Sequence, residues 1–167
     1  MAKNLADRLE ALSGYKHLFS TGDSQANLNP VNTSYLRFKL GGRIYYLLSR
    51  IADAGLDYTQ RTNKLAHHVV LSREELAIAG PAWMASQSGF FQTTWEGEAR
   101  ILPSNKPMPQ GNLQTSVCHA WANIVGDAGW AGVLAESILK RSSSETYLIC
   151  KPGTNVLELF LEAQALL

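Results

Sequence analysis

Alternation of apolar and polar side chains predicts a β-hairpin in the first third of the chain. In residues 35–40, Leu36, Phe38 and Leu40 alternate with polar neighbours, which is the pattern of a half-buried strand. A second apolar run begins at Arg43, and only two glycines, Gly41-Gly42, separate the two runs. Two alternating runs joined by Gly-Gly predict a tight hairpin. Residues 65–71 are expected to form a third strand.

Helical periodicity marks other segments. Leu5, Leu9 and Leu12 recur at spacings of four and three, which predicts an amphipathic helix over residues 4–12. Ser72 and Glu75 have the spacing of a capping box, so a short helix is expected to follow Ser72. Further helices are expected over residues 81–86, 117–124, 130–139 and 155–167. A second hairpin over 89–102 and a strand over 145–150 complete the expected elements.

These elements predict an α+β fold. The expected sheet is mixed or antiparallel and is built from the 35–50 hairpin, the 65–71 strand and the 146–150 strand, with helices covering it. The length of 167 residues suits a single domain over residues 1–167 with a full core.

Composition narrows the range of partners. Charged residues make up 17% of the chain, below the roughly one quarter of an average globular protein, so we expect a partner surface or a further part of the chain to cover apolar area. The net charge of +1 leaves no basic excess for nucleic acid, and no apolar run approaches the ~20 residues that span a bilayer. Cys118 and Cys150 lie in apolar segments, which predicts free and mostly buried thiols in a cytoplasmic protein.

The last expected helix is apolar around almost its whole circumference, and a helix of that kind is buried. We therefore expect residues 155–167 to lie in the core or to cover another chain, which makes a homodimer one possible state. The apolar end also leads us to expect that the sequence is the N-terminal part of a longer protein.

The densest polar chemistry lies in residues 49–71. We expect residues 50–64 of this segment to form a loop between strands, and the binding site to lie in the segment. The candidate binding residues are Arg50, Asp53, Asp57, Arg61, Lys64, His67 and His68. A structural role for Asp57 with Arg61, holding the shape of the loop, is favoured over contact with a substrate.

Two further roles are open within this segment. Arg50, Arg61 and Lys64 together could hold a carboxylate or a phosphate. His67 and His68 are adjacent on an expected strand and so face opposite ways. They cannot both bind one metal ion, and the scattered histidines give no zinc site. No cofactor is expected, and the sequence identifies no catalytic residue.

Four phrases of the sequence carry a family resemblance: Ser49–Leu71, Gly80–Phe91, Trp95–Leu102 and Gly126–Glu136. They resemble the N-terminal domain, second type, of GTPase-associated protein one, a bacterial family, and the resemblance extends over roughly residues 9–167. It implies an adaptor or regulatory role in a GTPase-centred system and supplies no catalytic residues.

Two functions from different classes follow. The leading expectation is a non-enzymatic adaptor domain that binds another protein in a bacterial cytoplasmic signalling or defence assembly through the loop of residues 50–64. The alternative is an enzyme or small-ligand binder that recognises an anionic group through residues 50–68. A deep pocket in which Arg61 and His67 converge would favour the second.

Overall fold

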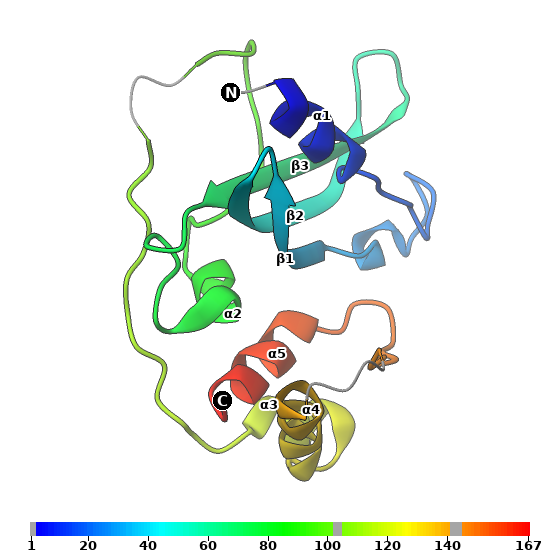
Figure 1. Ribbon diagram of the computed structural model, residues 1–167. Coiled ribbons are helices and arrows are strands. Elements are labelled where there is room, and N and C mark those ends of the chain that lie inside the picture. The colour runs from blue at the N-terminus through cyan, green and yellow to red at the C-terminus, as the bar shows by residue number, and fades with distance from the viewer. Residues whose placement is uncertain (1–2, 102–104, 141–144) are drawn as a thin grey trace. The chain divides into compact units, whose positions relative to one another are not determined.

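The computed structural model describes residues 3–101, 105–140 and 145–167 (Figure 1). The described chain is an α+β fold that divides into two compact units. The first unit comprises Met1–Leu76 with Ser88–Met108, and the second comprises Ala77–Gln87 with Pro109–Leu167. Each unit is described by itself below. The single domain expected over residues 1–167 stays a prediction.

A three-stranded antiparallel sheet forms the centre of the first unit. Its strands are β1 (Asn32–Leu40), β2 (Arg43–Leu56) and β3 (Thr62–Leu71), in the order β1-β2-β3. Gly41 and Gly42 connect β1 to β2 with φ of 54° and 82°. A two-residue turn with positive φ at both positions matches the twist of the flanking strands. The Gly-Gly hairpin predicted from the sequence is therefore confirmed.

The expected loop over residues 50–64 is wrong for most of its length, whereas the expected strand over residues 65–71 is confirmed by β3. β2 continues to Leu56 and β3 begins at Thr62, so the segment is a second hairpin with a short turn. The register shifts between Asp53 and Leu56, where Gly55 has a φ of 76°. A glycine in the left-handed region lets the strand bulge and continue. The many polar side chains were taken to indicate a loop, but the backbone hydrogen bonds that pair two strands do not depend on side-chain polarity.

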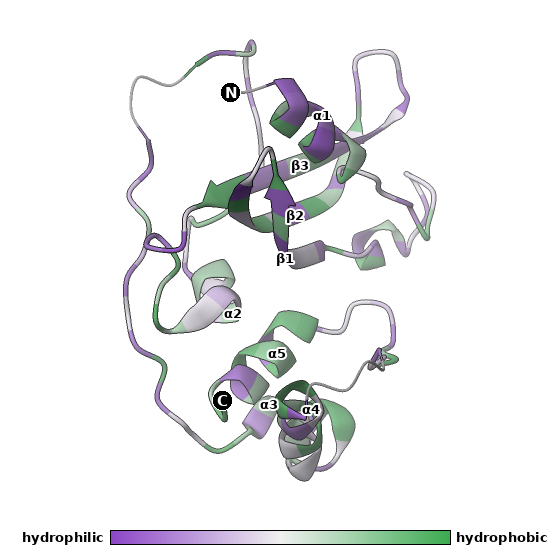
Figure 2. Ribbon diagram, viewed as in Figure 1, coloured by the Kyte–Doolittle hydropathy of each residue, from purple (hydrophilic) through white to green (hydrophobic). Residues whose placement is uncertain are grey.

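Helix α1 (Lys3–Ala11) covers one face of the sheet. Leu5 and Leu9 are buried against Leu47, which is fully enclosed. The partly buried residues around this cluster are Leu12, Phe38, Leu40, Tyr45 and Val70. Figure 2 shows hydrophobic residues interleaved with hydrophilic ones along α1, as expected for an amphipathic helix that packs on a sheet.

Three expected elements are absent from the residues that the structure describes. The capping contact after β3 forms, with Ser72 N donating to Glu75 Oε2 at 2.8 Å, but turns follow instead of a helix. Residues 89–101 contain no strand, and the expected end of that hairpin at residue 102 lies outside the described residues. Residues 145–150 form no strand and belong to the second unit. The apolar runs in residues 89–101 and 145–150 pair with no neighbouring strand among the described residues, and a strand needs such cross-strand partners for its stability.

The second unit is helical. Its helices are α2 (Gly80–Ser86), α3 (His119–Val125), α4 (Gly129–Leu139) and α5 (Val156–Gln164). Trp121 and Leu159 are enclosed in its core, and Trp121 Nε1 donates to Leu159 O at 2.8 Å. The Glu162 carboxylate accepts from Ala120 N at 2.9 Å and so satisfies an amide at the start of α3.

Helix α5 is only partly buried within this chain. Leu159 and Ala163 are enclosed, whereas Phe160 is 44% exposed. The expectation that the whole helix lies in the core is therefore wrong, and coverage by another chain stays a prediction. Both cysteines are free, with Cys118 buried and Cys150 half-buried.

Candidate functional site

The turn between β2 and β3 is built around Asp57. Its Oδ1 accepts from Thr59 N at 2.7 Å, Thr59 Oγ1 at 2.7 Å and Arg61 N at 3.0 Å, and these hydrogen bonds lower the pKa of the carboxyl. Asp57 N also donates to Arg61 O at 2.8 Å. Asp57 therefore binds the backbone of Arg61. Among the described residues no ion pair joins their side chains.

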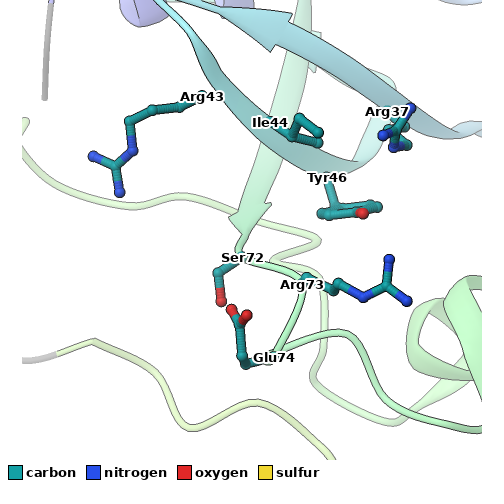
Figure 3. Close-up of a pocket in the computed structure, with 7 residues that line it drawn as sticks. All are labelled: Arg37, Arg43, Ile44, Tyr46, Ser72, Arg73 and Glu74. Carbon is teal, nitrogen blue, oxygen red and sulfur yellow. The ribbon is translucent and has the colours of Figure 1, made fainter.

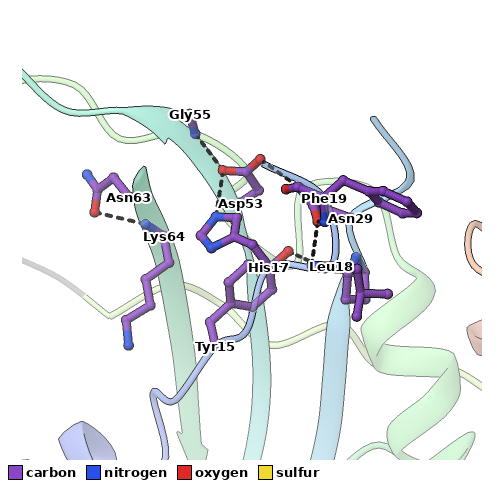
Figure 4. Close-up of polar contacts among 10 residues, drawn as sticks. Tyr15, His17, Leu18, Phe19, Asn29, Asp53, Gly55, Asn63 and Lys64 are labelled. Carbon is purple, nitrogen blue, oxygen red and sulfur yellow. Dashed lines mark hydrogen bonds and ion pairs between the residues drawn. The ribbon is translucent and has the colours of Figure 1, made fainter. Parts of the chain in front are cut away.

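Asp53 lies further down β2 and anchors the segment that follows α1 (Figure 4). Its Oδ1 is 3.1 Å from His17 Nε2 and accepts from Gly55 N at 2.9 Å, while Oδ2 accepts from Asn29 Nδ2 at 3.3 Å. Burial pushes the pKa of Asp53 upward, but the hydrogen bonds from Gly55, His17 and Asn29 outweigh it and hold the pKa below its ordinary value. Asn29 Oδ1 also accepts from the backbone amides of Leu18 and Phe19 at 2.9 Å each.

His68 and Lys64 fasten the end of α1 to the same face. His68 Nε2 lies 2.8 Å from Ser13 Oγ, and His68 Nδ1 lies 2.7 Å from Ser49 Oγ. Lys64 Nζ donates to the carbonyl oxygen of Ser13. Burial lowers the pKa of His68, so the imidazole is neutral at neutral pH. Both residues therefore hold α1 and the following segment on the sheet.

His67 and Arg50 are cross-strand partners on the opposite face of the sheet. His67 Nδ1 accepts from Gln92 N at 2.9 Å, and its ring meets Phe91 edge-on at 5.7 Å. Burial lowers the pKa of His67, and the charges of Lys106 and Arg50 add to this effect. The opposite orientation of the two histidines agrees with the sequence argument.

The seven candidate residues thus lie in three separate places. Asp57 and Arg61 are at the hairpin turn. Asp53, Lys64 and His68 are on the face that α1 covers, and Arg50 with His67 is on the other. The three basic groups Arg50, Arg61 and Lys64 are therefore not brought together, and Arg61 does not converge with His67.

The sequence argument missed a basic hollow at the end of the sheet (Figure 3). The strand register places Arg37 and Tyr46 of this hollow on the face opposite α1. It has a volume of about 370 Å³ and is lined by Arg37, Arg43, Ile44, Tyr46, Ser72, Arg73 and Glu74. Arg37 and Arg73 face the hydroxyl of Tyr46 and lower its pKa, Arg37 most strongly. Arg43 points away from Tyr46, toward the other end of the hollow.

The register of the sheet creates this convergence. Tyr46 on β2 pairs with Arg37 on β1 and with Leu71 on β3, and Arg73 follows two residues later. A signal for half of the hollow was present in the sequence, because a two-residue turn at Gly41-Gly42 places Arg37 opposite Tyr46. Arg73 carried no comparable signal, since the register of β3 was unknown.

The described residues contain neither a cluster of metal ligands nor a membrane-spanning helix. No group of three or more His, Cys, Asp or Glu side chains in residues 3–101, 105–140 and 145–167 is placed to hold a metal ion. The expectation of no metal and no cofactor stays a prediction. In the same ranges, no helix has both the length and the apolar character to cross a membrane.

The antiparallel sheet with a helix on one face defines the first unit as a small α+β domain. The family described as GTPase-associated protein 1, N-terminal domain type 2, matches residues 1–107, and the chain belongs to this family. The match ends next to Met108, the last residue of the first unit, so the resemblance seen in residues 126–136 lies outside it. No curated protein and no solved structure matches the chain.

Proposed function

We propose that the chain is a non-enzymatic adaptor or regulatory domain of a bacterial, cytoplasmic signalling or defence assembly that contains a GTPase. The family to which residues 1–107 belong is named for association with a GTPase, and this name supports a protein partner. A homodimer through α5 and the absence of nucleic-acid binding belong to the same proposal.

One observation carries the non-enzymatic part of the proposal. The polar groups of the candidate segment bind the domain itself, as the contacts of Asp53, Asp57 and His68 show. A catalytic site needs a nucleophile, acid or base that faces a place for the substrate. The alternative, an enzyme or anion binder that uses residues 50–68, lacks such a convergence and stays a hypothesis.

Crosslinking in cells tests the proposal. The full-length protein, carrying a photocrosslinking residue at position 39 or 58, is produced at its natural level in its own bacterium, and crosslinked proteins are identified by mass spectrometry. We expect a protein with a GTPase domain to be enriched over an uncrosslinked control. Enrichment of no GTPase from either position would contradict the proposal.

The purified partners then distinguish an adaptor from a regulator. An adaptor leaves the GTP hydrolysis rate of the GTPase unchanged while forming a stable complex with it. A regulatory domain changes that rate. Turnover of a small molecule by the chain alone, lost on substitution of a candidate residue, would overturn the non-enzymatic assignment.

A further inference from the structure

The basic hollow contains three arginines, Arg37, Arg43 and Arg73, and one carboxylate, Glu74. Hydrogen bonds from its own backbone and from Ser72 lower the pKa of Glu74, and the charge of Arg73 helps to lower it. Among the described residues, the ion pairs are His17 with Asp53 and Lys140 with Glu136, so none involves an arginine of the hollow. The nearby Glu74 carboxylate is directed at Ser72 (Figure 3). Each guanidinium carries five N–H donors in a planar fork that suits a carboxylate. The Tyr46 hydroxyl between Arg37 and Arg73 adds a further donor for an oxyanion.

The hollow lies beside an open edge of the sheet. β1 pairs only with β2 in the described chain, so its other edge is unpaired. β1 is exposed from Asn32 to Arg37 and again at Lys39. An exposed edge strand presents a row of N–H and C=O groups to which an extended segment can add.

The side chains of β1 differ between its two faces. Arg37 and Lys39 lie on the face of the hollow, and Tyr35 on that face stacks on Tyr46 with ring centroids 6.5 Å apart. Leu36, 37% exposed, lies on the other face beside Phe38, which is half-buried in the cluster under α1. An added strand would meet positive charge on one face and apolar surface on the other.

We propose that the outer edge of β1 and the hollow of Arg37, Tyr46 and Arg73 bind an extended acidic segment of a partner protein, in which Asp or Glu alternates with apolar residues. The carboxylates lie on the arginine face, and the apolar side chains lie over Leu36 and Phe38. This proposal rests on the adaptor function and specifies the chemistry of its partner.

Charged residues on an edge strand also deter aggregation, and Lys39 alone would fit that role. Arg73 argues for recognition because it is not on the edge strand. It comes from the segment after β3 and still faces Tyr46 beside Arg37. Two guanidiniums from separate elements around one hydroxyl form a receptor for an anionic group, which protection of an edge does not require.

Peptide titration against the full chain provides the test. The probe is a fluorescent eight-residue peptide of alternating Glu and Val, measured by anisotropy at low salt. The control peptides replace Glu with Lys or place Pro at the two central positions, which removes the amide donors needed for strand pairing. We expect the Glu-Val peptide to bind and both control peptides to bind much more weakly.

Charge-reversal variants locate the site. Loss of charge-assisted hydrogen bonds in Arg37→Glu and in Arg73→Glu should each weaken binding by about tenfold or more. Lys16→Glu makes the same charge change at an exposed position outside the hollow and should have little effect. Circular dichroism confirms that each variant is folded, and Arg37→Gln and Arg73→Gln replace any variant that is not.

Three results of the peptide titration would overturn the proposal: no binding of the Glu-Val peptide, weakening by Lys16→Glu equal to that by Arg37→Glu or Arg73→Glu, or displacement of the peptide by inorganic phosphate at concentrations near the dissociation constant of the peptide. The last result would assign the hollow to a small anion. A GTPase that still crosslinks to Arg37→Glu in cells at the level of the unsubstituted protein would refute this site and leave the adaptor function standing.

Discussion

Ser49 donates its hydroxyl hydrogen to Nδ1 of His68 across the β2–β3 pair, over 2.7 Å. The direction follows from the other nitrogen of the ring. Ser13 Oγ donates to Leu9 O at 2.8 Å, so it can only accept from His68 Nε2. The imidazole therefore carries its proton on Nε2, and Nδ1 is the acceptor.

Protonation of His68 breaks this arrangement. A proton on Nδ1 would face Ser49 Oγ, whose own hydrogen would then need another acceptor in a buried site where Ser49 is 2% exposed. The pKa of His68 is accordingly lowered by burial. The unfolded chain binds more protons than the folded one near the ordinary histidine pKa of about 6.5, so stability is present above that pH and decreases as pH falls.

We predict that the free energy of unfolding, measured by urea titration with circular dichroism, falls as the pH is lowered from 7.5 to 5.5. His68→Gln removes a titrating group and should flatten this dependence while lowering stability at pH 7.5. His119→Gln, at an exposed position, is the matched control and should leave the slope unchanged. Identical slopes for His68→Gln and the unsubstituted chain would refute the assigned role of His68.

Asp57 is predicted to control the local order of the hairpin turn. Asp57→Ala removes the acceptor of three hydrogen bonds, so the amides of Thr59 and Arg61 should exchange with solvent several-fold faster. Tyr58→Ala, at a side chain that is 97% exposed, is the control. Because the pKa of Asp57 is lowered, acid should also loosen the turn as the pH falls below about 3.9. Unchanged exchange at both amides in Asp57→Ala would contradict the prediction.

The two thiols are predicted to differ in reactivity. Cys118 is buried, and burial together with the Glu162 charge raises the pKa of its thiol, whereas Cys150 is half-buried. Thiolate is the reactive form of a cysteine. A disulfide-exchange reagent should therefore label Cys118 in the Cys150→Ser chain more slowly than it labels Cys150 in the Cys118→Ser chain. Equal rates in native buffer, or faster labelling of Cys118, would show that its environment is open.

The parts of the fold that could be predicted from the sequence rest on local signals. The Gly41-Gly42 turn and the leucine spacing of α1 each act within a few residues, and both were predicted. The expected strand over residues 145–150 failed because a strand needs a partner, and no local pattern identifies that partner. Ser72 and Glu75 form their contact without a helix, so a cap alone does not sustain one.

Site prediction failed for a related physical reason. Residues 50–64 were interpreted as a loop and residues 50–68 as one binding segment, yet alternation on paired strands sends Lys64 and His67 to opposite faces. Asp53 found its partners in His17 and Asn29, which lie far from it in the sequence. The convergence of Arg37 with Arg73 likewise depends on the register of β3, a long-range property that a single sequence does not state.

The last prediction separates the buried side of α5 from its exposed side. Leu159 is fully enclosed, and Leu159→Ala should destabilise the second unit by about 2–5 kcal/mol through the cavity it leaves. Phe160 is 44% exposed in this chain, so Phe160→Asp should leave the unit folded.

The homodimer proposed through α5 then predicts that Phe160→Asp sediments as a monomer at concentrations where the unsubstituted chain sediments as a dimer. Thermal melting and analytical ultracentrifugation measure both effects. A monomeric unsubstituted chain would refute the dimer, and a loss of folding in Phe160→Asp as large as in Leu159→Ala would refute the assignment of the two sides.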